Sequence, residues 1–516
     1  MKKNRRRHLI LLVLVVAAST AAWAVVPRRR SRDADSAAKV ASLPRIHPDY
    51  SEIVIPPNIA PMNFEVCESG SRFLVKISSE NGDPIEIGTR RSRISIPADP
   101  WRSLLQANRG GDLRIDVYVE AAGQWWRYET IVNRIAEADI SPYLAYRRIG
   151  PVHYRWTRVG VYQREMGTYR ESVVLDGMSL ETGCVNCHSF ANNDPAKMLI
   201  GIRSLRFGNA AILAVGDRLE KIGAKLGYTA WHPSGRLAAY SINNVCQFFH
   251  AAGTEVRDVI DVDAAIAYCR FDNGSMRLVP HAADKTRLES YPAWSPDGQY
   301  LYYCSAPILW TESDPMPPPQ YADVKYDLMR IRYDIDTDRW GEPETVLSSQ
   351  ETELSILQPR ISPDGRFLLF CMCRYGCFPV YQPTSDLYMM DLATREYARL
   401  EINSEFSESW HSWSSNSRWI AFSSRRENGG FFTRCYLSFV DEDGRAHKPF
   451  VLPQDDPQFY DSFLETISVP ELIDGPIPVA AKALADVARS KPVLVDAITG
   501  ASKPAANSDP WQTVRE

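Results

Sequence analysis

The sequence predicts an all-β protein whose larger part is a β-propeller, and three observations predict it. A pattern of apolar strand, tight turn and second apolar strand starts at Tyr228, Tyr291 and Gln358, and in a weaker form at Trp410. The turn reads S-P-D-G or a close variant of it, and the copies lie roughly 50 to 70 residues apart, which is typical of propeller blades. Before the repeats, short alternating strands are punctuated by Gly and Pro.

A five-residue motif, Cys184-Val185-Asn186-Cys187-His188, indicates a cofactor. C-x-x-C-H is the attachment site of a c-type haem, because two thiols at this spacing can each add to one haem vinyl group and the next imidazole can bind the iron. With 10 Cys and 9 His in 516 residues, chance expects roughly 0.003 such motifs. We therefore expect one covalent haem c, held by Cys184 and Cys187 with His188 on the iron.

Two alternatives to haem remain for this motif, a redox-active cysteine pair and half of a zinc site. A zinc site requires a second pair of ligands, and the nearest candidates, Cys371, Cys373 and Cys377, are almost two hundred residues away. A thioredoxin-type pair would open a helix, whereas the residues after His188 indicate a turn and then an apolar strand.

The N-terminus indicates export. Basic residues from Lys2 to Arg7 precede an uncharged apolar run over residues 9–26. Residues 1–30 therefore form a signal peptide, cleaved after Ala24, or a signal anchor held in the cytoplasmic membrane by residues 9–26. Both outcomes place the rest of the chain in the periplasm or on the periplasmic side of the bacterial inner membrane, where haem attachment and disulfides are possible.

The segment that follows divides into a linker and a small domain. Residues 31–61 are polar and interrupted by proline, and we expect an extended linker without a core. Residues 62–150 carry short alternating strands, among them Phe73–Ile77 and Leu113–Val119, and Leu104-Leu105-Gln106 suits one helical turn. An immunoglobulin-like β-sandwich accommodates this pattern.

We assign residues 151–473 to the propeller. The haem motif begins a blade of the same form, with Cys184–Phe190 as an inner strand and Met198–Ile202 as the second strand. That gives five blade starts, and chain from 154–175 or from 459–473 is available to close a sixth. Residues 474–516 are expected to be a disordered tail with an amphipathic helix over Val479–Arg489.

The motifs resemble the WD40-like (PD40) blades of TolB-type propellers. The whole arrangement resembles a group of exported bacterial proteins, TolB-like or cytochrome-like, that combine a sandwich domain, one C-V-N-C-H-S-F motif and a propeller. The resemblance is carried by Ile55-Pro56-Pro57-Asn58, Ile140-Ser141-Pro142-Tyr143, Cys184 to Phe190, Trp231-His232-Pro233-Ser234-Gly235, Trp410-His411-Ser412-Trp413, His447-Lys448-Pro449-Phe450 and Val469-Pro470-Glu471. It implies an architecture and a haem rather than a known reaction.

The second axial ligand of the iron has three candidates. If Trp413 aligns with Trp294, His411 lies on an inner strand facing the channel, so we rank it first. Met198 is the alternative, with core packing as its competing role. His232 comes last, because it stands where Ser295 and Ser362 stand in other copies and hydrogen bonding within the turn is expected.

The net charge of the exported part and the cysteines outside the haem motif bear on the possible partners and metal sites. Nine of the 59 Lys and Arg residues lie in the first 32 residues, so the exported part is acidic and we expect no nucleic-acid partner. Near Cys371, Cys373 and Cys377, one or two disulfides are favoured over a metal cluster. Asp297 and Asp364 are expected to close turns, and the chain has no nucleophile elbow or phosphate loop.

Together these features predict an exported, membrane-tethered, single-haem c-type cytochrome on a TolB-like propeller that handles electrons for a periplasmic protein or another electron-transfer partner. Two other functions stay open. One is a protein-binding scaffold or sensor with a structural haem, and the other is a haem-dependent oxidoreductase.

Overall fold

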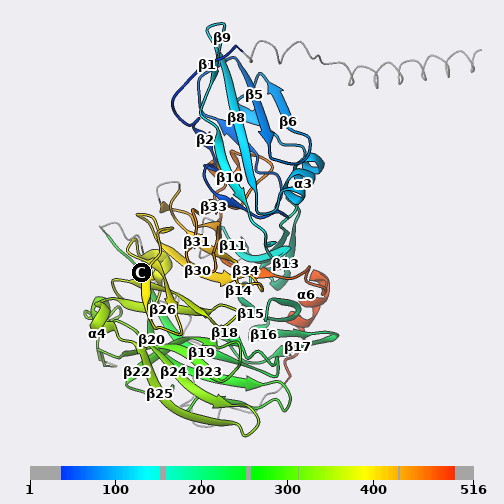
Figure 1. Cartoon of the computed structure of the whole chain (residues 1–516). Coiled ribbons are helices and arrows are strands. Elements are labelled where there is room, and N and C mark those ends of the chain that lie inside the picture. The colour runs from blue at the N-terminus through cyan, green and yellow to red at the C-terminus, as the bar shows by residue number, and fades with distance from the viewer. Residues whose placement is uncertain (1–35, 151–157, 252–256, 312, 428–429, 494–516) are drawn as a thin grey trace, which may run out of the picture.

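The computed structural model describes residues 36–150, 158–251, 257–311, 313–427 and 430–493. The apolar run over residues 9–26 and the end of the tail lie outside this part. None of the helices that are described has both the length and the apolar character needed to cross a bilayer. Figure 1 shows a smaller β-domain above a larger body built of β-sheets.

The larger body consists of six four-stranded blades, of which blades 3 and 4 join through one parallel bridge, Ala264 to Leu288. With the innermost strand given first, blade 1 consists of β34 (Thr466–Ile473), β11 (Tyr143–Ile149), β12 (Val159–Glu165) and β13 (Glu171–Asp176), and blade 2 of β14 (Cys184–Ala191), β15 (Asp194–Ser204), β16 (Gly208–Val215) and β17 (Arg218–Ile222). Blade 3 consists of β18 (Gly227–Trp231), β19 (Leu237–Phe249), β20 (Arg257–Arg270) and β21 (Met276–Leu278), and blade 4 of β22 (Arg287–Trp294), β23 (Tyr300–Pro307), β24 (Asp327–Asp334) and β25 (Arg339–Leu347). Blade 5 consists of β26 (Ser355–Ile361), β27 (Phe367–Cys373), β28 (Asp386–Asp391) and β29 (Tyr397–Arg399), and blade 6 of β30 (Glu408–Trp413), β31 (Trp419–Ser424), β32 (Arg434–Phe439) and β33 (Phe450–Val451).

The inner strands form a closed ring, because each contacts the next and β34 contacts both β30 and β14. Blade 1 closes the ring by pairing across the sequence: β34 comes from the C-terminal end of the propeller and pairs with β11 from its beginning. Both segments named for the sixth blade therefore contribute to it. The propeller starts earlier than residue 151, since β11 belongs to blade 1 rather than to the sandwich.

The blade turns are built as the S-P-D-G chemistry predicts. The Asp297 carboxylate accepts hydrogen bonds from the Ser295 hydroxyl and from the Gln299 N–H, at 2.5 and 3.0 Å. Asp364 accepts equivalent bonds from Ser362 and Arg366, at 2.6 and 3.1 Å. Gly298 has φ of 72°, in the left-handed region that glycine tolerates. These aspartates close turns, as expected.

The N-terminal domain has a seven-stranded sheet and a three-stranded sheet that share one core. The larger sheet contains β1 (Ala38–Lys39), β3 (Val54–Ile55), β5 (Arg72–Ser78), β6 (Ile85–Thr89), β8 (Asp112–Ala121), β9 (Gln124–Arg127) and β10 (Ile131–Ile135), and the smaller contains β2 (Ile46–His47), β4 (Phe64–Val66) and β7 (Arg93–Ile94). Helix α3 (Ala98–Ala107) packs on them through Trp101, Leu104 and Leu105. The strands expected from residues 62–150 are present, and the one helical turn expected at residues 104–106 is part of a longer helix of 10 residues.

The expectation that residues 31–61 form a coreless linker is wrong for the described part of this segment. It contributes β1, β2 and β3 to the domain, and Tyr50, Ile53 and Ile55 are almost fully buried. The prolines separate short strands here, so they mark the ends of paired segments rather than a chain kept extended in solvent.

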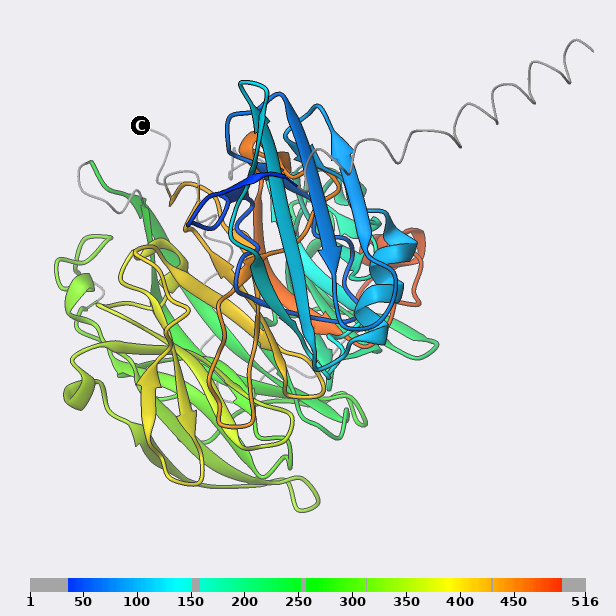
Figure 2. The ribbon, with the colours of Figure 1, turned by 45° about the horizontal axis from the view of Figure 1, so that its top comes forward.

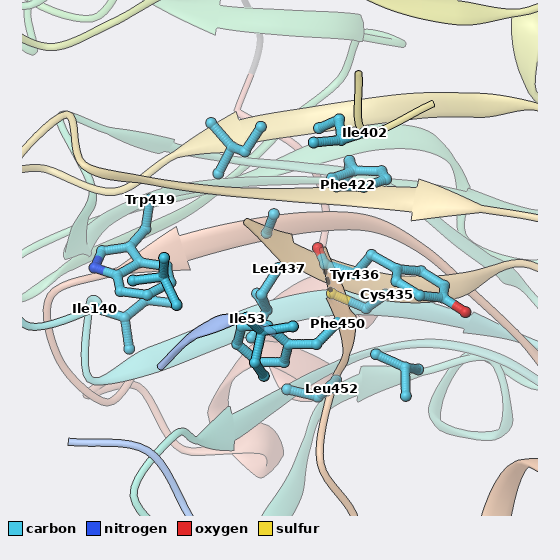
Figure 3. Packing of buried hydrophobic residues seen from close by; sticks show 14 of the residues in the cluster. Ile53, Ile140, Ile402, Trp419, Phe422, Cys435, Tyr436, Leu437, Phe450 and Leu452 are labelled. Atoms are coloured by element: carbon cyan, nitrogen blue, oxygen red, sulfur yellow. Dashed lines mark hydrogen bonds between the residues drawn. The ribbon is translucent and has the colours of Figure 1, made fainter. Parts of the chain in front are cut away.

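The two parts of the molecule are packed together through apolar side chains. Ile53 and Ile140 lie against residues of blade 6, among them Trp419, Leu437 and Phe450 (Figure 3). The Trp419 indole donates to the carbonyl of Ala138 at 3.1 Å. In two views the domain lies over blades 1 and 6 and leaves blades 3 to 5 uncovered (Figures 1 and 2).

The C-terminal helix α6 (Ala481–Arg489) is present where the amphipathic pattern predicts it, but it is docked rather than part of a loose tail. Leu484, Ala485 and Ala488 are buried against the core shared by blades 1 and 2. The remaining short helical segments are η2 (Met178–Leu180), η3 (Tyr321–Asp323), α4 (Ser349–Thr352), η4 (Pro379–Tyr381) and α5 (Phe459–Ser462).

If α6 is part of the folded unit, Leu484→Ala should lower the free energy of unfolding by about 2 to 5 kcal/mol, because it leaves a cavity at a fully buried site. Lys482→Ala on the exposed face of α6 is the matched control, and the loss of its pair with Asp486 should cost at most about 0.5 kcal/mol. Urea titration measures both. Equal, small effects would show that the helix is not docked.

Candidate functional site

The Cys-x-x-Cys-His motif lies on β14, the innermost strand of blade 2. In a regular strand, residues three apart fall in opposite phases of the pleat. The pairing of β14 with β15 shifts by one residue between Asn186 and His188, so Cys187 is the extra residue of a β-bulge. Position 187 therefore lies outside the regular alternation of the strand. Cys184 is half-buried.

His188 is buried, and neither of its ring nitrogens makes a hydrogen bond of regular geometry among the described residues, although the backbone of Ala145 and of Val469 lies close enough to favour its protonated form. Nε2 lies 4.0 Å from a carboxylate oxygen of Glu471. Burial lowers the pKa of His188 from its ordinary 6.5 to about 3, and the positive charge of Arg147 acts in the same direction. The imidazole is therefore neutral at physiological pH, which is the form that binds metal ions.

The bulge recurs in every blade and defines a level of the channel. The pairing of each inner strand slips by one residue, and the slip includes a residue with positive φ at Tyr228, Tyr291, Gln358, Trp410 and Val469. We call the residues that resume the pairing after the bulge the channel ring. They are His188, Ala230, Ala293, Arg360, Ser412 and Glu471, one from each blade.

All six residues of the channel ring line one cavity of about 410 Å³. This volume lies in the range of small-molecule and cofactor sites. Pro233, Pro296 and Pro363 of the blade turns also line it, so it extends toward that end of the channel. At the other end the rings of Tyr228, Tyr291 and Trp410 pack together, with centroids 4.2 to 6.0 Å apart. His188 thus lines a partly open cavity above this aromatic cluster, which we call the aromatic floor.

Two charged residues of the channel ring, Arg360 and Glu471, were not among the candidates from the sequence. Burial raises the pKa of the Glu471 carboxyl to about 7, although the Phe190 N–H, at 3.0 Å, and the charge of Arg360 oppose the shift. Burial lowers the pKa of Arg360 from its ordinary value, but a guanidinium stays protonated in proteins. Both residues stand two positions after the positive-φ residue of their bulge, and the repeat alignment contains this position for Arg360 but not for Glu471.

The structure confirms the alignment that placed His411 on an inner strand, and His411 lines the same cavity as His188. Both of its nitrogens are engaged, however. Nε2 lies 3.1 Å from the carbonyl oxygen of Leu369 and Nδ1 lies 3.7 Å from Sγ of Cys371. Its side chain is held by blade 5, which weighs against its role as the second iron ligand.

The two other ligand candidates lie in structural positions. Met198 is fully buried in the apolar core of blades 1 and 2, and it does not line the cavity. His232 makes the turn contacts expected of it: Nδ1 lies 2.8 Å from the Ser234 hydroxyl and Nε2 lies 3.1 Å from the Gly298 carbonyl.

The disulfides favoured near residues 371–377 are absent. Cys371, Cys373 and Cys377 are buried thiols. Sγ of Cys373 lies 3.2 Å from the Tyr375 carbonyl, whereas Sγ of Cys377 points to the Val259 carbonyl at 3.5 Å. Because each sulfur is directed at a different carbonyl, no pair is positioned to bond. No group of three metal-ligating side chains occurs in the described part of the chain.

Comparisons with known proteins do not identify a family. No family model and no curated protein matches the sequence. Among solved structures, TolB from Acinetobacter baumannii is similar at 14% identity over 73% of this chain and 85% of that chain, with a TM-score of 0.42. The tricorn protease is similar at 13% identity over 66% of this chain and 34% of that chain, with a TM-score of 0.32. Dipeptidyl peptidase 4 of Porphyromonas gingivalis is similar at 11% identity over 57% of this chain and 44% of that chain, with a TM-score of 0.29. At these scores the fold rests on the strand pairing described above.

The buried histidines predict that acid destabilises the protein. Burial lowers the pKa of His232 from 6.5 to about 4, so the unfolded chain binds a proton that the folded protein does not between these values. This contribution is fully present above pH 6.5 and decreases as the pH falls toward 4. Between pH 7 and pH 5 we expect His232 to account for a loss of about 2 kcal/mol in the free energy of unfolding.

His232→Gln tests this directly, because the amide does not titrate and retains hydrogen-bonding groups. Urea titrations at pH 7 and pH 5 should show a smaller loss in the variant than in the wild type. The same loss in both proteins would mean that His232 is protonated or exposed in the folded state.

Proposed function

We propose that this protein is an exported single-haem c-type cytochrome, in which Cys184 and Cys187 hold the haem covalently and His188 binds the iron. The proposed role is electron transfer with a periplasmic protein as partner. The N-terminal segment would supply export and, if it is retained, a tether to the cytoplasmic membrane. The proposal also places the chain with the TolB-like, cytochrome-like proteins that it resembles.

The observation that carries the proposal is that His188 is buried and neutral and lines the cavity. A buried imidazole whose nitrogens make no regular hydrogen bond is costly unless something binds it. Here the ring is neutral, lines a cavity and follows directly on the two cysteines of the motif. The bulge is compatible with the proposal, since it takes position 187 out of the regular alternation that would place it on the opposite face from Cys184.

When bound, a haem c supplies a one-electron iron couple whose potential depends on its ligands and its surroundings. The chain's own contribution is the site. The aromatic floor of Tyr228, Tyr291 and Trp410 closes one end, and the Arg360 guanidinium and the titratable Glu471 carboxyl lie at the level of His188.

A specific observation also favours a second candidate, a haem-dependent oxidoreductase or sensor. His411, the best placed second ligand, already has partners on both nitrogens, and Met198 lies outside the cavity. Without a second protein ligand, the iron of such a site would remain accessible to a small molecule.

Haem attachment is tested by peroxidase staining after denaturing electrophoresis of protein made together with haem-maturation machinery. The wild type should retain the stain, and the Cys184→Ala, Cys187→Ala double variant should lose it, because no thioether can form. Cys67→Ala is the matched control for an exposed cysteine outside the motif. Unchanged staining of the double variant would refute the proposal.

The second ligand is tested by the absorption spectrum of the holoprotein. Since Nε2 of His411 is already bonded to Leu369, we expect His411→Ala to leave the Soret band unchanged, and reduced wild-type protein to bind carbon monoxide. Conversion from a low-spin to a high-spin spectrum in His411→Ala would instead make His411 the distal ligand and favour pure electron transfer.

A further inference from the structure

The cavity wall formed by blades 5 and 6 carries hydrogen-bond donors without acceptors. The amide nitrogen of Gln358 and the indole nitrogen of Trp410 are both buried and have no partner among the described residues. Both residues line the cavity. The Gln358 side-chain oxygen accepts from the Trp410 backbone N–H at 2.8 Å, which fixes the orientation of the amide and leaves its NH₂ group unused.

Arg360 adds a positive charge to the same wall. It follows Gln358 by two residues on β26 and belongs to the channel ring. Its guanidinium donates to the carbonyl of Pro359 at 3.0 Å, and no described carboxylate forms an ion pair with it. The Glu471 carboxyl acts on Arg360 only at a distance, without an ion pair. The guanidinium therefore retains donors for a carboxylate, which it can bind through two parallel hydrogen bonds.

The arrangement of the six blades places this wall across from the haem motif. Blades 2 and 5 are three positions apart in a ring of six, so His188 and Arg360 face each other across the channel. On one side between them the ring has only Ala230 and Ala293, whose small side chains leave room. On the other side stand Ser412 and Glu471.

We propose that the channel binds a carboxylate at Arg360, Gln358 and Trp410, with the apolar body of the ligand beside Ala230 and Ala293. The Gln358 and Trp410 donors lack an acceptor, so an anion satisfies them. The single guanidinium of Arg360 pairs with one carboxylate, which matches a monocarboxylate when the ligand is free. The same chemistry would suit a propionate group of the proposed haem, so the carboxylate has two possible sources.

This site goes beyond the proposed haem function and does not require it. Benzoate is the probe, because it combines one carboxylate with a flat apolar body, and benzamide is its neutral isostere. Isothermal titration with each compound is done on the full chain, both on the holoprotein and on the haem-free Cys184→Ser, Cys187→Ser variant. We expect benzoate to bind about tenfold or more tightly than benzamide in at least one form.

The two forms distinguish the source of the carboxylate. Binding of benzoate by both forms indicates a free monocarboxylate as the ligand. Binding by the haem-free form alone indicates that a haem propionate occupies the site, and Arg360→Met should then shift the reduction potential of the holoprotein. A chain that never acquires haem still gives the benzoate result, so failure of the haem proposal and failure of this one are distinguishable.

Arg360→Met should remove the preference for benzoate, whereas Arg236→Met, at an exposed blade-turn arginine, should retain it. If Arg360→Met does not fold, the comparison of benzoate with benzamide on the wild type and on the haem-free variant still decides the question. Equal affinities for the two compounds in both forms, or a preference that survives Arg360→Met, would overturn the proposal.

Discussion

The pairing of β11 with β34 is the constraint on which the rest of the structure depends. It joins strands from the two ends of the propeller sequence, and the chain-closure entropy that opposes such a contact grows only slowly with the length of the loop. When the ring is closed, a carboxylate oxygen of Glu471 lies 4.0 Å from Nε2 of His188, and residues of β34 complete the lining of the cavity. The docking of α6 on blades 1 and 2 supports the same junction.

The β-bulge in each inner strand positions the polar side chains of the channel ring. The bulge in each inner strand presents one residue per blade at the same level, and the side chain at that position decides what the blade contributes. Blades 3 and 4 contribute alanine and leave space, whereas blades 1, 2 and 5 contribute Glu471, His188 and Arg360. The fold is common to many functions, so a function must be argued from these side chains.

Much of the fold could be predicted from the sequence, because S-P-D-G turns between apolar strands are local signals that recur. The N-terminal segment was misjudged for the opposite reason: the burial of Tyr50 and Ile53 depends on long-range packing against β10 and blade 6, which proline content does not reveal. The placement of β11 in blade 1 likewise depends on a partner strand more than 300 residues away.

Within the candidate site, the sequence placed His411 correctly on an inner strand. It could not give the direction of the ring nitrogens, which depends on contacts with Leu369 and Cys371 of blade 5. Arg360 and Glu471 are not iron ligands, so a haem motif does not point to them. The repeat alignment contains Arg360 in the column of Ala230 and Ala293, but Glu471 lies on β34, whose place in blade 1 depends on its pairing with β11. The thiols of Cys371, Cys373 and Cys377 could not be told from disulfides without their side-chain directions.

The most direct test of the account is a pyridine haemochrome spectrum of the full chain, purified after expression with haem-maturation machinery and stripped of non-covalent pigment with acidified solvent. The account predicts one haem per chain with the spectrum of a c-type haem, because both thiols of the motif form thioether bonds and His188 is available to the iron. A protein that retains no haem after this extraction would contradict it.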